Sequence, residues 1–195
     1  SVSSAGDMNG DDIGDVLVGA NLADPVVGGV GRDSAGISYV IFGRNRTTDL
    51  VALYANIDLL QLNTAGSALG FALLGSKASD QCGISVSAVG DINGDGISDV
   101  IVGASRASPV VGGAIRYSVG LSYVIYGLSK FGNTTLSSTN IDLLPLNTAA
   151  SSLGFVILGA TGFSGTSVSS AGDVNGDGIG DIIVGAYWAS PVVGG

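Results

Sequence analysis

The sequence predicts an all-β protein built from tandem units of four short antiparallel strands. Three observations support this fold class. Long segments recur in register, the apolar runs are rich in Val, Ile, Tyr and Phe and end at Gly, and the composition is poor in helix formers. Of 195 residues, 33 are Gly and only 12% are charged, and all 16 acidic residues are Asp. Because helical domains use Glu and Lys freely, this composition favours strands and tight turns.

The repeat is marked by a nine-residue loop that begins at Asp7, Asp91 and Asp173. Other segments keep the same register: residues 38–43 recur at 122–127, and residues 56–60 recur at 140–144. We therefore expect one repeat unit at 1–83, a second at 84–166 and a partial third at 167–195, as in a segment of a longer repeat array.

Each unit is predicted to contain four strands in the same order. The first precedes the loop and the second, continuously apolar and expected to be buried on both faces, follows it. The predicted first strands are 1–5, 84–89 and 167–171, the second 15–19, 99–103 and 181–185, the third 37–43 and 121–127, and the fourth 70–75 and 154–159.

Between the third and fourth strands, the segment from Asn140 to Leu146 leaves two interpretations open. Its apolar residues allow a short helix, whereas Pro145 favours a loop or an edge strand. The apolar sequence Pro-Val-Val-Gly-Gly, which follows the second strand in each unit, is expected to pack against a neighbouring unit or chain.

The repeated loop has the residues that a hard cation requires. Oxygen-bearing side chains stand at positions 1, 3, 5 and 9, and the carbonyl of position 7 can add another oxygen. A Gly-rich hairpin turn without metal is the alternative, but the mutual repulsion of three carboxylates would destabilise it. We expect one structural Ca²⁺ per loop, held by Asp7, Asn9, Asp11, Ile13 and Asp15, by Asp91, Asn93, Asp95, Ile97 and Asp99, and by Asp173, Asn175, Asp177, Ile179 and Asp181.

The third loop and its flanks, 167–178 and 181–186, resemble the FG-GAP repeat of integrin α-subunit propellers and of many microbial surface proteins. The resemblance covers essentially the whole chain. It implies four-stranded propeller-type blades with Ca²⁺ in the hairpin between strands one and two. The repeat period of this chain is longer than that of integrin-like blades. Two repeat units and part of a third cannot close a ring. We therefore expect an incomplete propeller or an open repeat array.

The first loop departs from the others at position 6, where Asp12 replaces Gly96 and Gly178. This position is expected to need a positive φ, which Asp tolerates better than most residues. The first site is therefore predicted to bind calcium more weakly.

Several classes of function are disfavoured by the composition. With no His, no Glu and one cysteine, Cys82, the chain offers no acid–base or nucleophilic constellation, and we predict a non-enzyme. Seven scattered Lys and Arg residues argue against nucleic acid, and no apolar run is long enough to cross a membrane. Asn45 and Asn133 stand in N-glycosylation sequons.

These observations predict an extracellular or cell-surface, calcium-stabilised structural or adhesive repeat protein. Incomplete blades leave open strand edges, so the expected partners are neighbouring copies of the chain or further repeats, in a surface or filament assembly. The alternative is a ligand- or glycan-binding propeller module of a larger receptor or lectin, with glycans or cell-surface proteins as partners.

Overall fold

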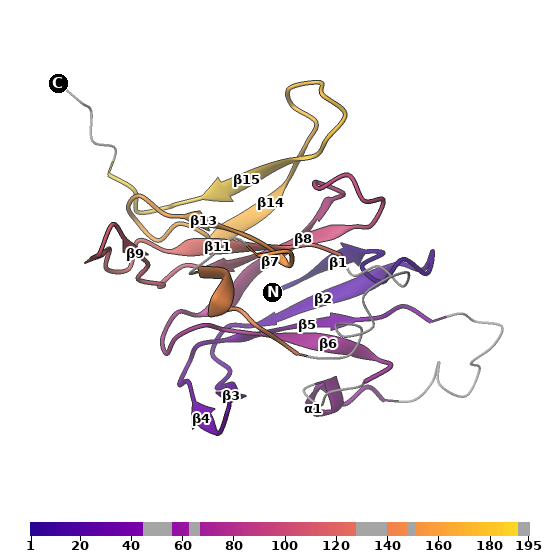
Figure 1. Cartoon of the computed structure of the whole chain (residues 1–195), viewed down its shortest axis with the longest axis horizontal. Helices are drawn as coiled ribbons and strands as arrows, with labels where there is room; N and C mark the ends of the chain where they lie inside the picture. The colour runs from indigo at the N-terminus through magenta and orange to yellow at the C-terminus, as the bar shows by residue number, and fades with distance from the viewer. Residues whose placement is uncertain (45–55, 63–66, 128–139, 148–150, 191–195) are drawn as a thin grey trace.

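The computed structural model describes residues 1–44, 56–62, 67–127, 140–147 and 151–190. Apart from two short two-stranded arms, the strands in this part of the chain form two sheets and a hairpin, stacked as three layers (Figure 1). The all-β prediction is confirmed. No helix among these residues has the length and apolar character needed to cross a membrane.

The first layer is a five-stranded sheet in the order β1-β2-β5-β6-β12. Its first four strands are the predicted ones, and all of them pair antiparallel. A two-stranded arm, β3–β4, projects from the connection between β2 and β5 (Figure 1). The elements are β1 (Val2–Gly6), β2 (Asp15–Ala20), β3 (Val26–Val27), β4 (Val30–Gly31), β5 (Ile37–Ile41), α1 (Leu59–Leu62) and β6 (Gly70–Leu74).

The second layer repeats this plan in the order β13-β11-β8-β7, again with a short arm, β9–β10. Only in this middle layer is the second strand buried along its whole length, because it alone has a layer on each side. The elements of this part of the chain are β7 (Cys82–Gly90), β8 (Asp99–Ala104), β9 (Val110–Val111), β10 (Ala114–Ile115), β11 (Leu121–Ile125), β12 (Ile141–Asp142), a 3-10 helix (Pro145–Asn147) and β13 (Gly154–Leu158). Of these, β12 belongs to the sheet of the first layer.

The third layer is the hairpin of β14 (Ser167–Gly172) and β15 (Asp181–Gly185). It lies on the outer face of the second sheet (Figure 1). Within the described residues, β15 pairs with β14 alone, whereas its counterparts β2 and β8 each pair with two strands.

Most of the hydrophobic core lies between the layers. Leu17, Val40 and Phe71 of the first layer pack in one cluster with Val102 and Tyr123 of the second. A second cluster joins the opposite face of the middle sheet to the third layer through Ile101, Val124 and Val168. Most apolar residues are therefore buried by stacking one unit on the next, and a smaller cluster of Ile37, Ala72 and Leu74 lies within the first unit.

The ambiguous segment between the third and fourth strands takes both conformations. In the second unit, Ile141–Asp142 is an edge strand, parallel to β6 of the first unit, and a 3-10 helix follows. In the first unit, the equivalents Ile57 and Asp58 have no regular structure, and the short helix α1 begins directly after them at Leu59. The lone cysteine, Cys82, is buried in the core, as expected for a small apolar residue.

Candidate metal-binding loops

Three hairpin loops, between β1 and β2, β7 and β8, and β14 and β15, carry the predicted ligands at one end of the stack (Figure 1). The first aspartate of each loop accepts hydrogen bonds from the loop's own backbone. In the second loop, Asp91 Oδ1 accepts the N–H groups of Gly94 at 2.7 Å and Asp95 at 3.1 Å, and Oδ2 accepts that of Gly96 at 2.7 Å. Asp173 repeats these three bonds with Gly176, Asp177 and Gly178, and Asp7 makes two of them, with Asp11 and Asp12.

The middle of each loop is ordered by its Asn and its second ligand Asp. Asn93 Oδ1 accepts the N–H of Asp95 at 3.0 Å, and Asp95 Oδ1 accepts that of Ile97 at 2.9 Å. The Asn93 amide also donates to Asp95 Oδ2 at 3.0 Å. These Asx-type bonds wind the loop into consecutive turns. The other two loops make the same three bonds, through Asn9 and Asp11 and through Asn175 and Asp177.

The aspartate at position 9 connects the loop to the sheet. Asp99 is fully buried, and its carboxylate accepts the N–H of Ile92 at 2.9 Å and that of Gly127 at 2.8 Å. Asp15 makes the equivalent bonds to Met8 and Gly43. Sequence reasoning missed the role of Gly43 and Gly127, although their recurrence at the end of the predicted third strands was a usable signal.

The third loop differs because the structure describes no third strand beside it. Asp181 accepts the N–H of Val174 at 2.7 Å, as its counterparts do within their own loops. Ile179 is 46% exposed, whereas Ile97 of the second loop is buried against the first loop. Ser98 of the second loop also donates its N–H to the carbonyl of Asp7 at 3.1 Å, so neighbouring loops contact each other.

The two ends of the second loop differ in electrostatics. Burial raises the pKa of Asp99, and the nearby carboxylates of Asp95 and Asp91 raise it further, against the effect of its two backbone donors. Asp15 shows the same raised pKa for the same reasons. Desolvation opposes a low pKa at Asp91, but three backbone N–H donors outweigh it and lower the pKa. The second loop therefore holds a readily ionised carboxylate, Asp91, close to the buried Asp99, whose ionised form is disfavoured.

Position 6 adopts the predicted left-handed backbone in all three loops. Asp12 has a φ of 65°, and Gly96 and Gly178 both have a φ of 86°. The first loop thus places a side chain where the other two have the residue best suited to that conformation.

The donor set of the loops fits a hard cation, since every candidate ligand is a carboxylate, an amide or a carbonyl oxygen. Across the described ranges, however, no three acidic, thiol or imidazole side chains converge on a common point that could hold a metal. In each loop the five predicted ligands lie close together in the chain. Several of their carboxylate oxygens, however, accept hydrogen bonds from backbone N–H groups and do not point at a shared metal position. The two predicted glycosylation residues, Asn45 and Asn133, lie outside the described residues.

Comparison with known families gives two matched regions. The model of the FG-GAP repeat matches residues 83–125 and residues 164–195. Each match contains one complete nine-residue loop with the strands on either side of it.

The chain is also similar in sequence to parts of much longer curated proteins. The chain is 32% identical over 186 residues to a phosphatidylinositol-glycan-specific phospholipase D of Bos taurus, covering 95% of this chain and 18% of the relative. It is 37% identical over 128 residues to integrin alpha pat-2 of Caenorhabditis briggsae and 35% identical over 131 residues to that of Caenorhabditis elegans. These matches cover 65% and 66% of this chain and 9% of each integrin. The chain thus spans less than a fifth of the length of these relatives.

Proposed function

Because this chain is an FG-GAP repeat protein, we propose that it is a calcium-stabilised structural or adhesive module of an extracellular or cell-surface protein. Its similarity to integrin α chains supports a repeat module of the adhesion or receptor type. The matched part of the phospholipase relative is under a fifth of that protein, and we propose no enzymatic activity for this chain.

The arrangement of carboxylates in the loops is the observation that carries the calcium proposal. Asp99 is fully buried and takes two backbone N–H donors, yet its ionised form is disfavoured by burial and by Asp95 and Asp91. A divalent cation between these groups would reverse their repulsion. The ligands would be the side chains at positions 1, 3, 5 and 9 with the carbonyl of position 7, and the ion would supply charge neutralisation and cross-linking of the hairpin. Three such ions would offset most of the formal net charge of −9.

A stabilising role follows from linkage, because an ion that binds the folded loop and not the unfolded chain adds its binding free energy to folding. Calcium at about one hundred times its dissociation constant contributes about 2.7 kcal/mol per site. The melting temperature should therefore be higher in millimolar calcium than in EGTA.

Two variants make the measurement specific. Asp95→Asn removes a proposed ligand charge from the second loop, and it should reduce the calcium-dependent rise in melting temperature. Asp33→Asn removes an exposed charge outside the loops and should leave that rise unchanged. Identical melting curves with and without calcium would refute the proposal.

A second candidate function, glycan binding, is favoured by an aromatic cluster formed by one residue before β14 and two residues after β15. The rings of Phe163 and Tyr187 stack with centroids 5.9 Å apart and an interplanar angle of 17°. Trp188 packs edge-on against Tyr187 at 6.0 Å, and Tyr187 and Trp188 are 69% and 68% exposed. Exposed aromatic groups of this size mark interaction sites. A glycan array that compares the native chain with Trp188→Ala tests this function, and equal or absent signals would exclude it.

A further inference from the structure

Each of the three loops contains the same tripeptide, Asn-Gly-Asp, at positions 3 to 5. Its asparagines, Asn9, Asn93 and Asn175, are the asparagines of the sequence that precede a glycine. An asparagine before glycine is chemically labile, because the backbone nitrogen of the glycine can attack the side-chain amide carbon without obstruction from a Cβ. The product is a succinimide ring, which water opens to aspartate or isoaspartate. Because the three tripeptides are identical, their unfolded forms should react at nearly equal rates.

The fold holds the three asparagine side chains in the same way. In the first loop, Asn9 Oδ1 accepts the N–H of Asp11 at 3.0 Å, and Asn9 Nδ2 donates to Asp11 Oδ2 at 3.1 Å. The corresponding bonds of the other two loops have lengths of 2.9–3.0 Å. The N–H that donates to Oδ1 also stabilises the negative charge that develops on this oxygen when the amide carbon is attacked. These bonds therefore do not distinguish one loop from another.

The attacking nitrogen, in contrast, is restrained in two of the loops. The N–H of Gly94 donates to Asp91 Oδ1 at 2.7 Å, and that of Gly176 donates to Asp173 Oδ1 at 2.7 Å. Within the described residues, the N–H of Gly10 makes no corresponding bond to the first aspartate of its loop. Gly10 is also exposed to solvent. The first loop thus differs from the other two at the atom that starts the reaction.

The bond from the glycine N–H to the aspartate hinders the reaction in two ways. The nitrogen must lose its proton as it attacks, and a carboxylate oxygen at 2.7 Å both holds that proton and disfavours negative charge on the nitrogen. The carboxylate is also too weak a base to remove the proton itself. Breaking one hydrogen bond of ordinary net strength before the attack lowers the rate about fivefold. The nitrogen of Gly10 carries neither restraint.

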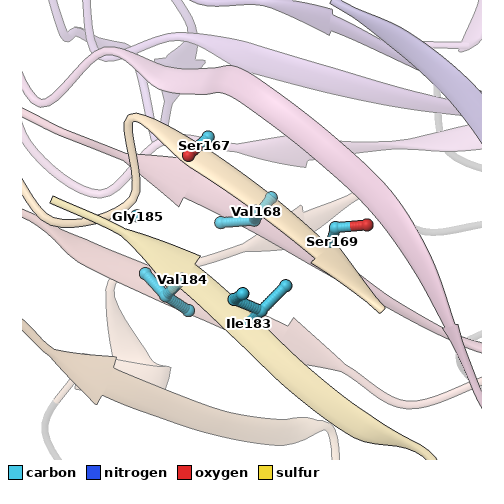
Figure 2. Close-up of a pocket in the computed structure, with 6 residues that line it drawn as sticks. All are labelled: Ser167, Val168, Ser169, Ile183, Val184 and Gly185. Carbon is cyan, nitrogen blue, oxygen red and sulfur yellow. The ribbon is translucent and has the colours of Figure 1, made fainter. Parts of the chain in front are cut away.

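Solvent exposure alone would give a different order of reaction. Asn93 and Asn175 are exposed, whereas Asn9 is partly buried. The third loop also joins β14 and β15, whose outer face carries a shallow hollow lined by residues such as Ser169 and Ile183 (Figure 2). If access of water set the rate, the third loop would react before the first. If the bond to the glycine N–H sets the rate, the first loop reacts before the others.

We propose that Asn9 is a site of spontaneous deamidation, and that it reacts faster in the folded chain than Asn93 and Asn175. The Gly10 nitrogen forms a bond to Asn9 Cγ, and the bond from Cγ to Nδ2 breaks. The proton of the Gly10 N–H is replaced on the leaving amide nitrogen through water, so ammonia departs. One water molecule then hydrolyses either carbon–nitrogen bond of the succinimide, which gives aspartate or isoaspartate at position 9. The reaction needs no oxidant, and the proposal does not rest on calcium.

The modification removes a hydrogen bond from the first loop and adds a charge to it. In the product, a carboxylate replaces the Asn9 amide that donates to Asp11 Oδ2, so two carboxylates face each other. The four carboxylates of this loop, from Asp7, Asp11, Asp12 and Asp15, become five. Without a cation, their repulsion destabilises the folded loop. The deamidated chain should therefore unfold at a lower temperature than the native chain.

The native chain carries its own controls for the rate measurement. The three asparagines lie in different tryptic peptides, 1–32, 78–106 and 131–195, so mass spectrometry can follow all three sites in one sample. The folded chain is incubated at neutral pH in EGTA, and a sample digested at time zero corrects for conversion during digestion. Aspartate plus isoaspartate should accumulate at Asn9 at least about fivefold faster than at Asn93 or Asn175. In urea, where the chain is unfolded, the three rates should be nearly equal.

A variant tests the consequence for stability. Asn9→Asp reproduces the aspartate product, and in EGTA it should lower the melting temperature by at least about 2 °C. Asn56→Asp is the matched control, since it adds the same charge at an exposed residue outside the loops, and its effect should be smaller. Equal melting temperatures of the two variants would contradict the destabilisation of the loop by the added carboxylate.

Three results of the rate measurement would overturn the proposal. Equal rates at the three sites of the folded chain would show that the free N–H of Gly10 has no effect. A faster reaction at Asn175 than at Asn9 would show that access of water sets the rate. An excess at Asn9 that persists in urea would assign the difference to the flanking sequence and not to the fold. Because all samples contain EGTA, none of these outcomes depends on the calcium proposal.

Discussion

Arg32 and Asp142 form a two-pronged ion pair between the first and second repeat units. Arg32 Nη1 lies 2.7 Å from Asp142 Oδ1, and Nη2 lies 2.9 Å from Oδ2. The same guanidinium donates to the carbonyl of Gly75 at 2.8 Å. The two side chains are 14% and 27% exposed, so the pair is largely shielded from water.

Replacing Arg32 by Lys should destabilise the chain, because one ammonium cannot reproduce two parallel bonds to a carboxylate and a third to a carbonyl. We expect a loss of about 1–3 kcal/mol in the free energy of unfolding, measured with urea. Arg116→Lys is the control, since Arg116 has the same repeat position but is exposed. Equal losses in the two variants would show that the ion pair has no particular role.

The contribution of Asp142 should depend on pH. Burial alone would raise its pKa, but hydrogen bonds from Arg32 and Leu144 outweigh burial and lower it. A lowered pKa in the folded state stabilises the fold above the unfolded value of about 3.9, and this stabilisation is lost as the pH falls through the folded value. The stability difference between the native chain and Asp142→Asn should be full at pH 7 and should shrink below about pH 4. A difference that stays constant down to pH 2.5 would contradict this.

The ion pair also explains what the sequence could not predict. Residues 56–60 and 140–144 are identical, so local propensity cannot distinguish them. Both copies even make the same local bond, from the N–H of Leu60 or Leu144 to the Asp two residues before it, at 3.0 Å. Among the described residues, the second copy lies beside the edge of β6 and forms the ion pair with Arg32. There it becomes the strand β12. Tertiary contacts decided the conformation.

The repeat register, in contrast, was sufficient to predict most of the fold. The strands around each loop begin or end close to their expected positions, because apolar runs bounded by Gly and Asp leave few alternatives. The loops were also identified from spacing alone. Their N–H partners across the sheet, Gly43 and Gly127, were not, since pairing a loop with the end of a distant strand requires the sheet order.

A buried chain of hydroxyl groups should make Tyr123 more sensitive to substitution than its repeat equivalent. Tyr123 Oη donates to Ser76 Oγ at 2.8 Å, and Ser76 donates to the buried carboxylate of Asp80 at 2.9 Å. Tyr123→Phe leaves one acceptor of this network unsatisfied and should cost about 1 kcal/mol. Tyr39→Phe removes the same atom from a partly exposed side chain of β5 and should cost less. The pair is compared by urea unfolding, and a larger loss for Tyr39 would contradict the role of the network.

Gly103 should be intolerant of any side chain, for a reason that concerns the stacking of units. A Cβ at this position would collide with the backbone carbonyl of Gly165, just before β14 of the third layer, and one at Gly19 would collide with that of Gly83, in β7 of the second layer. Since backbone cannot move aside as a flexible side chain can, Gly103→Ala should force the layers apart and cost about 1–3 kcal/mol.

Two alanine variants complete the test by urea unfolding. Gly31→Ala, where a Cβ would have open space, should be near neutral. Gly185→Ala occupies the repeat position of Gly103, but its Cβ would meet mainly the side chain of Ser167 within the same hairpin, which can rotate. Its loss should therefore be smaller than that of Gly103→Ala. Equal losses at Gly103 and Gly185 would mean that the close approach between units does not set the requirement for glycine.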